Sequence, residues 1–130
     1  MIERPFFYRE TSNIRVTVRP AYLQAQSQPF LNRYVFVYFI RIENVGKKRA
    51  QLLSRRWLIH DSIGEDQQVE GEGVVGQQPI LGPGEVHEYN SFCILKSPQG
   101  YMEGAYHFIG SDDVLFDVEI PRFYLQAQEQ

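Results

Sequence analysis

Hydrophobic and polar positions alternate with a period of two along much of the chain, which is typical of β-strands. The clearest segment runs over residues 34–43, where one face carries Tyr34, Phe36, Tyr38, Ile40 and Ile42. The opposite face is apolar at first, with Val35, Val37 and Phe39, and becomes polar at Arg41 and Glu43. A helix of these residues would be apolar nearly all round and rich in β-branched and aromatic side chains, so the pattern predicts a central strand.

Turn-forming residues separate further segments with a strand pattern. Residues 44–46 form a turn signal, and the basic run 47–49 is expected at its solvated tip. In the returning strand we expect Leu53, Trp57 and Ile59 on one side and Leu52 and Leu58 on the other. Other strands are predicted near 14–19, 87–95, 101–109 and 114–124.

These elements predict an all-β fold. About seven strands without a helix to cross between them favour antiparallel sheets, because parallel strands need long crossover connections. The prediction is an antiparallel β-sandwich of the fibronectin type III or immunoglobulin-like kind. A chain of 130 residues builds one core, so we expect a single domain over 1–130, with its core at about 14–125 and short flexible termini.

Composition and charge indicate a globular protein and argue against a nucleic-acid-binding one. Apolar residues make up 43% of the chain and charged residues 22%, as in a globular protein. The net charge is −3, but residues 1–64 hold eleven basic and four acidic side chains, whereas 65–130 hold two and twelve. Neither half has the like-charged blocks of a nucleic-acid surface, so we do not expect a nucleic-acid partner.

The predicted location is the cytoplasm. No apolar run approaches the ~20 residues that cross a bilayer, so no membrane partner is expected. Residues 1–5 lack the basic and apolar regions of a secretory signal. A lone cysteine, Cys93, cannot form an internal disulfide, and on a strand it is expected to be a buried, inert thiol.

Gly71, Gly73 and Gly76 match the G-x-G-x-x-G spacing of dinucleotide-binding loops. Those loops bind a pyrophosphate where a strand leads into a helix, but here Pro79 and Pro83 follow and exclude a helix. The pattern therefore predicts a glycine-rich loop between strands. An anion held by successive backbone N–H groups, which needs no helix, stays the alternative.

No set of residues assembles a catalytic centre, so we expect a protein without enzymatic activity or cofactor. His60, His87 and His107 are 27 and 20 residues apart, unlike the short-spaced ligand pairs of structural zinc sites. No metal site is predicted, although strands can bring distant residues together.

Arg55 and Arg56 are candidates for binding a partner. Neighbouring strand residues point to opposite faces, so Arg55 shares the side of Trp57 and Arg56 points away from it. If Trp57 belongs to the core, Arg55 lies at the rim of the core. An arginine beside aromatic side chains suits a protein interface. The alternative is a packed tryptophan flanked by solvated arginines.

Several blocks of the sequence resemble the ApaG domain. They lie between about residues 14 and 125 and comprise 34–38, 40–44, 51–57, 69–79, 81 with 83–85, and 98–104. The sequence departs from the family pattern at Arg56, where a His is common, and at Phe92, where a Gly is common.

The resemblance implies a fibronectin type III-like sandwich. Relatives of this kind occur as small bacterial proteins and as domains of eukaryotic proteins, including an F-box protein, with an inferred role in protein interaction. Bacterial members are linked to cobalt resistance and magnesium efflux. The family's glycine motif, here Gly71, Gly73 and Gly76, has been proposed to bind a nucleotide pyrophosphate.

We therefore expect a non-enzymatic binding module that presents loops or a sheet edge to an unidentified protein. Edge strands also invite self-association, so a weak homodimer through a sheet edge stays open. The alternative function is binding of a small ligand, an anion such as pyrophosphate or a nucleotide, or a divalent cation, with the loop 71–76 as the site.

Overall fold

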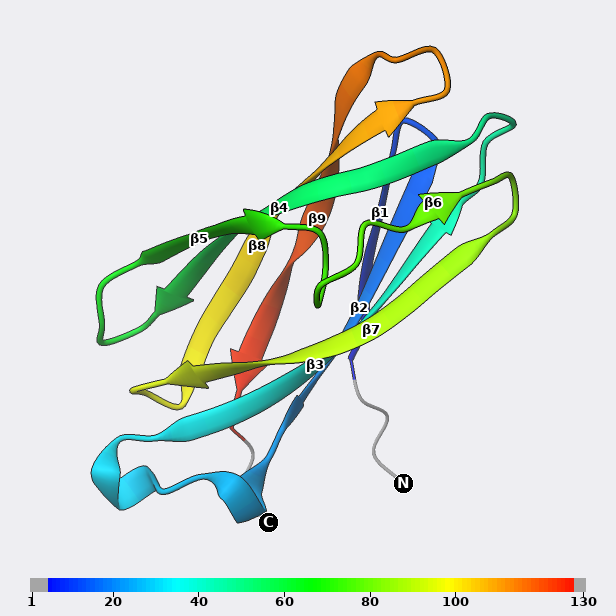
Figure 1. The fold of residues 1–130 in the computed structure, drawn as a ribbon. Coiled ribbons are helices and arrows are strands. Elements are labelled where there is room, and N and C mark those ends of the chain that lie inside the picture. The colour runs from blue at the N-terminus through cyan, green and yellow to red at the C-terminus, as the bar shows by residue number, and fades with distance from the viewer. Residues whose placement is uncertain (1–4, 128–130) are drawn as a thin grey trace.

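The computed structural model describes residues 5–127, in which nine strands and two short 3-10 turns follow one another (Figure 1). The elements are β1 (Phe7–Thr11), β2 (Ile14–Tyr22), η1 (Gln24–Gln26), η2 (Pro29–Leu31), β3 (Tyr34–Asn44), β4 (Ala50–Asp61), β5 (Gln67–Glu72), β6 (Ile80–Leu81), β7 (Val86–Leu95), β8 (Gln99–Gly110) and β9 (Leu115–Gln126). Within this part of the chain, no helix has the length and apolar content needed to span a membrane.

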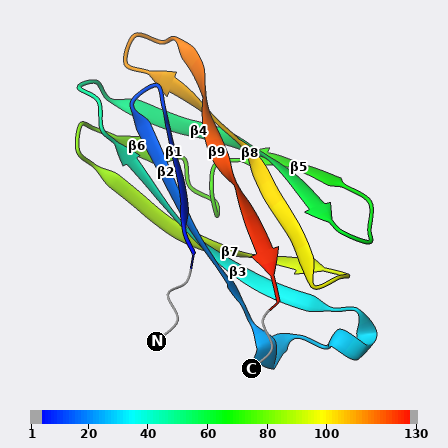
Figure 2. The ribbon, with the colours of Figure 1, turned by 180° about the vertical axis from the view of Figure 1, so that it is seen from behind.

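The strands form two antiparallel sheets that pack face to face (Figures 1 and 2). The first sheet has the order β1-β2-β3-β7, and the second has the order β5-β4-β8-β9 with β6 paired to β4. The predicted all-β sandwich is confirmed. The strand count was too low: β1 is mostly exposed and β6 has two residues, so neither carries a readable alternation. The predicted termini include residues 1–4 and 128–130, which lie outside the described residues, and the domain bounds stay a prediction.

The core lies between the inner faces of the two sheets. Phe36, Tyr38, Ile40 and Ile42 of β3 are all at most 5% exposed and face the second sheet. Trp57 of β4 packs edge-on against Tyr38, with ring centroids 5.5 Å apart. Each such side chain contributes about 1.5–3 kcal/mol through its removal from water.

A β-bulge in β4 corrects the predicted sides of that strand. The pairing of β4 with β8 shifts in register between Leu52 and Ser54, so Leu53 is an extra residue. The bulge lets Leu52 and Trp57 point into the core together, although five positions separate them. The prediction that put Leu53 with Trp57, and Leu52 on the other side, is therefore wrong.

The two long sides of the sandwich differ. On one side β1 lies next to β9, where Arg9 Nε is 2.8 Å from Glu119 Oε2 and the Glu119 amide donates to Thr11 Oγ1. On the other side the first sheet ends at β7 and the second at β5, and no strand in the described residues joins these two edges. The sandwich is therefore closed along β1 and β9 and open along β7 and β5.

The bulge makes a testable distinction between two neighbouring leucines. Leu52→Ala is expected to lower the free energy of unfolding by about 2–5 kcal/mol, because it leaves a cavity in the core. Leu53→Ala is expected to cost about 1 kcal/mol or less, since its side chain is only half-buried. Urea denaturation of both variants measures the difference, and equal losses would contradict the bulge.

Candidate functional site

Arg55 lies at the open side of the sandwich and ties β4 to the end of β5. Its Nη1 donates hydrogen bonds to the carbonyl oxygens of Glu72, at 3.1 Å, and of Gly73, at 2.8 Å. The guanidinium lies against Gly71, where a Cβ would stand only 2.9 Å from Nη1. The structure thus brings together three of the predicted residues, Arg55, Gly71 and Gly73, and gives Gly71 a packing role.

The glycine turn, residues 71–77, is a hairpin-like turn. The Val74 amide donates to the Gln77 carbonyl at 2.8 Å, and the Gln77 amide donates back to Val74 at 3.0 Å. Val75 and Gly76 between them have φ angles of 49° and 78°, the left-handed values of a tight turn. The expectation of a glycine-rich loop without a helix agrees with this geometry.

The backbone amides of the glycine turn are mostly engaged within the chain. The Gly73 amide donates to the Leu53 carbonyl at 2.8 Å, which adds to the two amides already bonded across the turn. Gly76 lies at the exposed tip, away from the Arg55 guanidinium that Gly71 contacts. Binding of a phosphate by Gly71, Gly73 and Gly76 stays a prediction.

Behind Arg55 lie three tyrosines on the inner faces of both sheets. The hydroxyls of Tyr89 and Tyr106 are 2.5 Å apart and share a hydrogen bond. Burial raises the pKa of Tyr38, Tyr89 and Tyr106 above the ordinary value of a phenol, while the nearby Arg55 charge acts weakly in the opposite direction. The three phenols therefore stay neutral at physiological pH and act as hydrogen-bonding groups.

Arg56 does not belong to the same site as Arg55. Its side chain is exposed on the outer face of the second sheet, where its strand position is opposite Glu70 of β5. The surrounding surface mixes both charge signs, including the pair Arg122–Glu103 with an N–O distance of 2.9 Å. The two arginine candidates thus lie on opposite sides of one sheet and cannot contact one region of a partner together.

The outer face of the first sheet carries an apolar surface that the sequence analysis did not single out. We call Val37, Phe39, Phe92 and Ile94 the outer patch. Phe39, Phe92 and Ile94 are 46%, 58% and 51% exposed, and Val37 is buried beside Phe92 without belonging to the core between the sheets. The apolar outer positions of the segment 34–43 were the signal that could have found this patch.

The histidines are distributed over separate parts of the two sheets. His60 Nδ1 is 2.6 Å from Asp66 Oδ1, and His107 Nδ1 is 2.7 Å from Asp117 Oδ1. Burial lowers the pKa of His87, which faces the interior from β7. Within residues 5–127, no group of three or more His, Cys, Asp or Glu side chains could hold a metal ion.

A family model for the ApaG domain matches residues 24–110. The chain belongs to the ApaG family. A protein named ApaG from Thiobacillus denitrificans is 52% identical over 112 residues, which cover 86% of this chain and 88% of that protein. A second, from Rhodospirillum centenum, is 48% identical over 117 residues and 90% of each chain. The crystal structure of the ApaA protein from Bordetella pertussis matches with a TM-score of 0.87 at 44% identity, over 95% of this chain and 97% of that one.

Two glycines of the ApaG-family motif are expected to respond differently to substitution. Gly73→Ala should lower the free energy of unfolding by about 3 kcal/mol or more, because φ is +61° and the new Cβ would overlap the Gln77 carbonyl oxygen. Gly76→Ala should cost about 1 kcal/mol, since its φ is also positive but the space around it is open. Thermal or urea unfolding tests this order, and a larger loss for Gly76→Ala would contradict it.

Cys93 is expected to be unreactive in this ApaG-family fold. Burial raises the pKa of its thiol to about 12, so only about one molecule in ten thousand carries the thiolate at pH 8. In the folded protein the Cys93 thiol should react with a reagent such as DTNB only as fast as transient unfolding exposes it. In guanidinium-unfolded protein the thiol should react at once. Equal rates for both states would contradict the buried position.

Proposed function

We propose that this protein is a non-catalytic binding module of the cytoplasm that docks an extended segment of a partner protein onto β7 and the outer patch. The observation that carries the proposal is the coincidence of exposed apolar side chains with the edge of β7, to which no strand within residues 5–127 is paired. Large exposed apolar patches on a small protein mark interaction surfaces.

The register of β7 supports an extended partner. The backbone amide of Asn44 in β3 donates to the Glu85 carbonyl at 3.0 Å. Hydrogen-bonded pairs alternate along antiparallel strands, so His87 and the other odd-numbered residues of β7 bond to β3. The even-numbered residues then present their N–H and C=O groups at the outer edge. Phe92 and Ile94 belong to this even-numbered set, so the same residues offer backbone hydrogen bonds and apolar side chains.

A strand added to this edge would use both features. Backbone hydrogen bonds to β7 would supply affinity, and alternate apolar side chains of the partner would cover the outer patch. Arg19 of β2 lies opposite Phe39 at the margin of the patch and would contact acidic groups of the partner.

The link to cobalt resistance and magnesium efflux that the family resemblance implies stays a prediction about physiological setting. So does binding of an anion or a cation at the glycine turn. The identity of a protein that binds β7 would test the first, and calorimetry with pyrophosphate, ATP and Co²⁺ would test the second.

Site-specific cross-linking tests the docking surface. A photo-reactive p-benzoylphenylalanine in place of Phe92 should form an adduct in cells that the same residue in place of Leu115 does not form. Leu115 is a matched control because it is 68% exposed and starts β9 in the other sheet. With the purified partner, Phe92→Glu should raise the Kd about 30-fold or more, as for a central aromatic contact, and Leu115→Glu should leave it unchanged.

Two outcomes would overturn the proposal. Adducts at position 92 that contain only a second copy of this chain would assign the edge to a homodimer. Equal adducts at both positions would show that cross-linking reports exposure rather than docking. Circular dichroism and urea midpoints of both variants confirm that each remains folded.

A further inference from the structure

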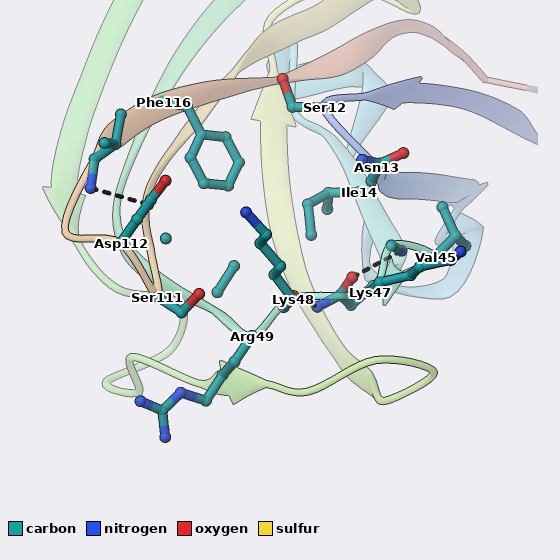
Figure 3. Close-up of a pocket in the computed structure, with 15 residues that line it drawn as sticks. Ser12, Asn13, Ile14, Val45, Lys47, Lys48, Arg49, Ser111, Asp112 and Phe116 are labelled. Carbon is teal, nitrogen blue, oxygen red and sulfur yellow. Dashed lines mark hydrogen bonds between the residues drawn. The ribbon is translucent and has the colours of Figure 1, made fainter.

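Three loops at one end of the sandwich border a solvent-open cavity of about 510 Å³ (Figure 3). They are the turn between β1 and β2, the basic turn between β3 and β4, and the loop between β8 and β9. This volume lies in the range of small-molecule sites in proteins. The cavity is separate from the glycine turn, since none of residues 71–77 lines it.

Hydrogen bonds hold the three loops in place. The buried Asn44 side chain donates through Nδ2 to the Lys48 carbonyl at 2.8 Å and accepts from the Gly46 amide through Oδ1 at 2.9 Å. The Val45 amide donates to the Asn13 carbonyl at 2.9 Å, and the Ser111 amide donates to the Arg49 carbonyl at 3.1 Å. The basic turn is therefore hydrogen-bonded to both of the loops beside it.

Most charged residues that border the cavity are basic. They are Lys47, Lys48 and Arg49, and among the residues that the structure describes no carboxylate oxygen lies within 4.0 Å of their charged groups. The one acidic lining residue, Asp112, uses Oδ1 to accept from the Val114 amide at 3.2 Å. An acidic protein thus has three consecutive basic residues on one turn that borders the cavity.

Lys48 and Arg49 differ in direction. The Lys48 side chain extends into the middle of the cavity, toward Phe116 and Asp112, whereas the Arg49 side chain points away from it (Figure 3). The two residues are neighbours on one turn and carry the same charge. Substitution of each residue in turn therefore distinguishes a contact inside the cavity from the general attraction of a basic surface.

The floor of the cavity is apolar. Ile14 is 1% and Ala50 6% exposed, and Phe116 stacks on Phe108 of the neighbouring strand with ring centroids 5.6 Å apart. The Lys48 side chain extends from the basic turn in the direction of the Phe116 ring (Figure 3). A ligand would thus meet a flat aromatic surface and a cation in the same space.

We propose that this cavity binds a small organic phosphate monoester that carries a flat ring. Its phosphate would bind the Lys48 ammonium and the Ser111 hydroxyl, and its ring would pack on Phe116. A phosphate monoester carries a charge close to −2 at neutral pH and three acceptor oxygens, which suit an ammonium group and a hydroxyl donor. A carboxylate offers half that charge, and inorganic phosphate leaves the apolar floor uncovered.

Titration of the ¹⁵N-labelled full chain with phenyl phosphate tests the proposal by NMR. The amides of residues 12–14, 45–49 and 110–116 should shift with a Kd in the millimolar range or tighter. Inorganic phosphate and benzoate should each bind at least about tenfold more weakly, because each lacks one of the two matched features. Lys48→Gln should raise the Kd for phenyl phosphate at least about tenfold, and Arg49→Gln less than about threefold.

Other results would overturn it. If Lys48→Gln and Arg49→Gln raise the Kd for phenyl phosphate equally, the binding depends on surface charge and not on the cavity. Shifts confined to residues 71–77 would move the ligand to the glycine turn, and no shift at about 10 mM phenyl phosphate would leave the cavity without the proposed ligand. Both substitutions lie on an exposed turn, and unchanged amide spectra elsewhere would show that the fold is intact.

Discussion

The two-residue alternation of β3 fixes the register of the first sheet and decides which side chains each of its faces carries. β3 pairs with β2 on one side and with β7 on the other, in both cases without a register shift. One set of its side chains, such as Phe36 and Ile40, builds the core, and the other set, with Val37 and Phe39, lies outside it. A slip of one residue would exchange the two sets, so burial of the larger aromatic set fixes the register and leaves the smaller apolar set on the outer face.

The sequence predicted the long strands well, because their alternation is a direct consequence of having one buried face. It failed where alternation is ambiguous. Leu52 and Leu53 are equally apolar neighbours, and only the pairing with β8 reveals which of them is the extra residue of the bulge. β6 consists of Ile80 and Leu81, and two residues cannot display a period.

The glycine motif shows a different limit of sequence reasoning. The absence of a following helix could be predicted from Pro79, since proline cannot continue a helix. The contact of Gly71 with the Arg55 guanidinium could not, because it depends on the pairing of β4 with β5, in which Arg55 lies opposite Gly71. The spacing of the motif shows which positions are glycine. The residues paired with them across the sheet determine why a side chain does not fit there.

The interior of the sandwich is suited to rigidity more than to chemistry. Burial keeps the Tyr106 phenol and the Cys93 thiol in their neutral forms, so neither is a ready base or nucleophile at physiological pH. A closely packed interior also offers no room for a ligand without loss of core contacts. Both proposals therefore place recognition where the sheets end or face outward: at the edge of β7 and on the outer patch, and at the end of β3, where the Asn44 side chain holds the basic turn in place. One strand, β3, thus shapes both the proposed docking face and the proposed ligand cavity.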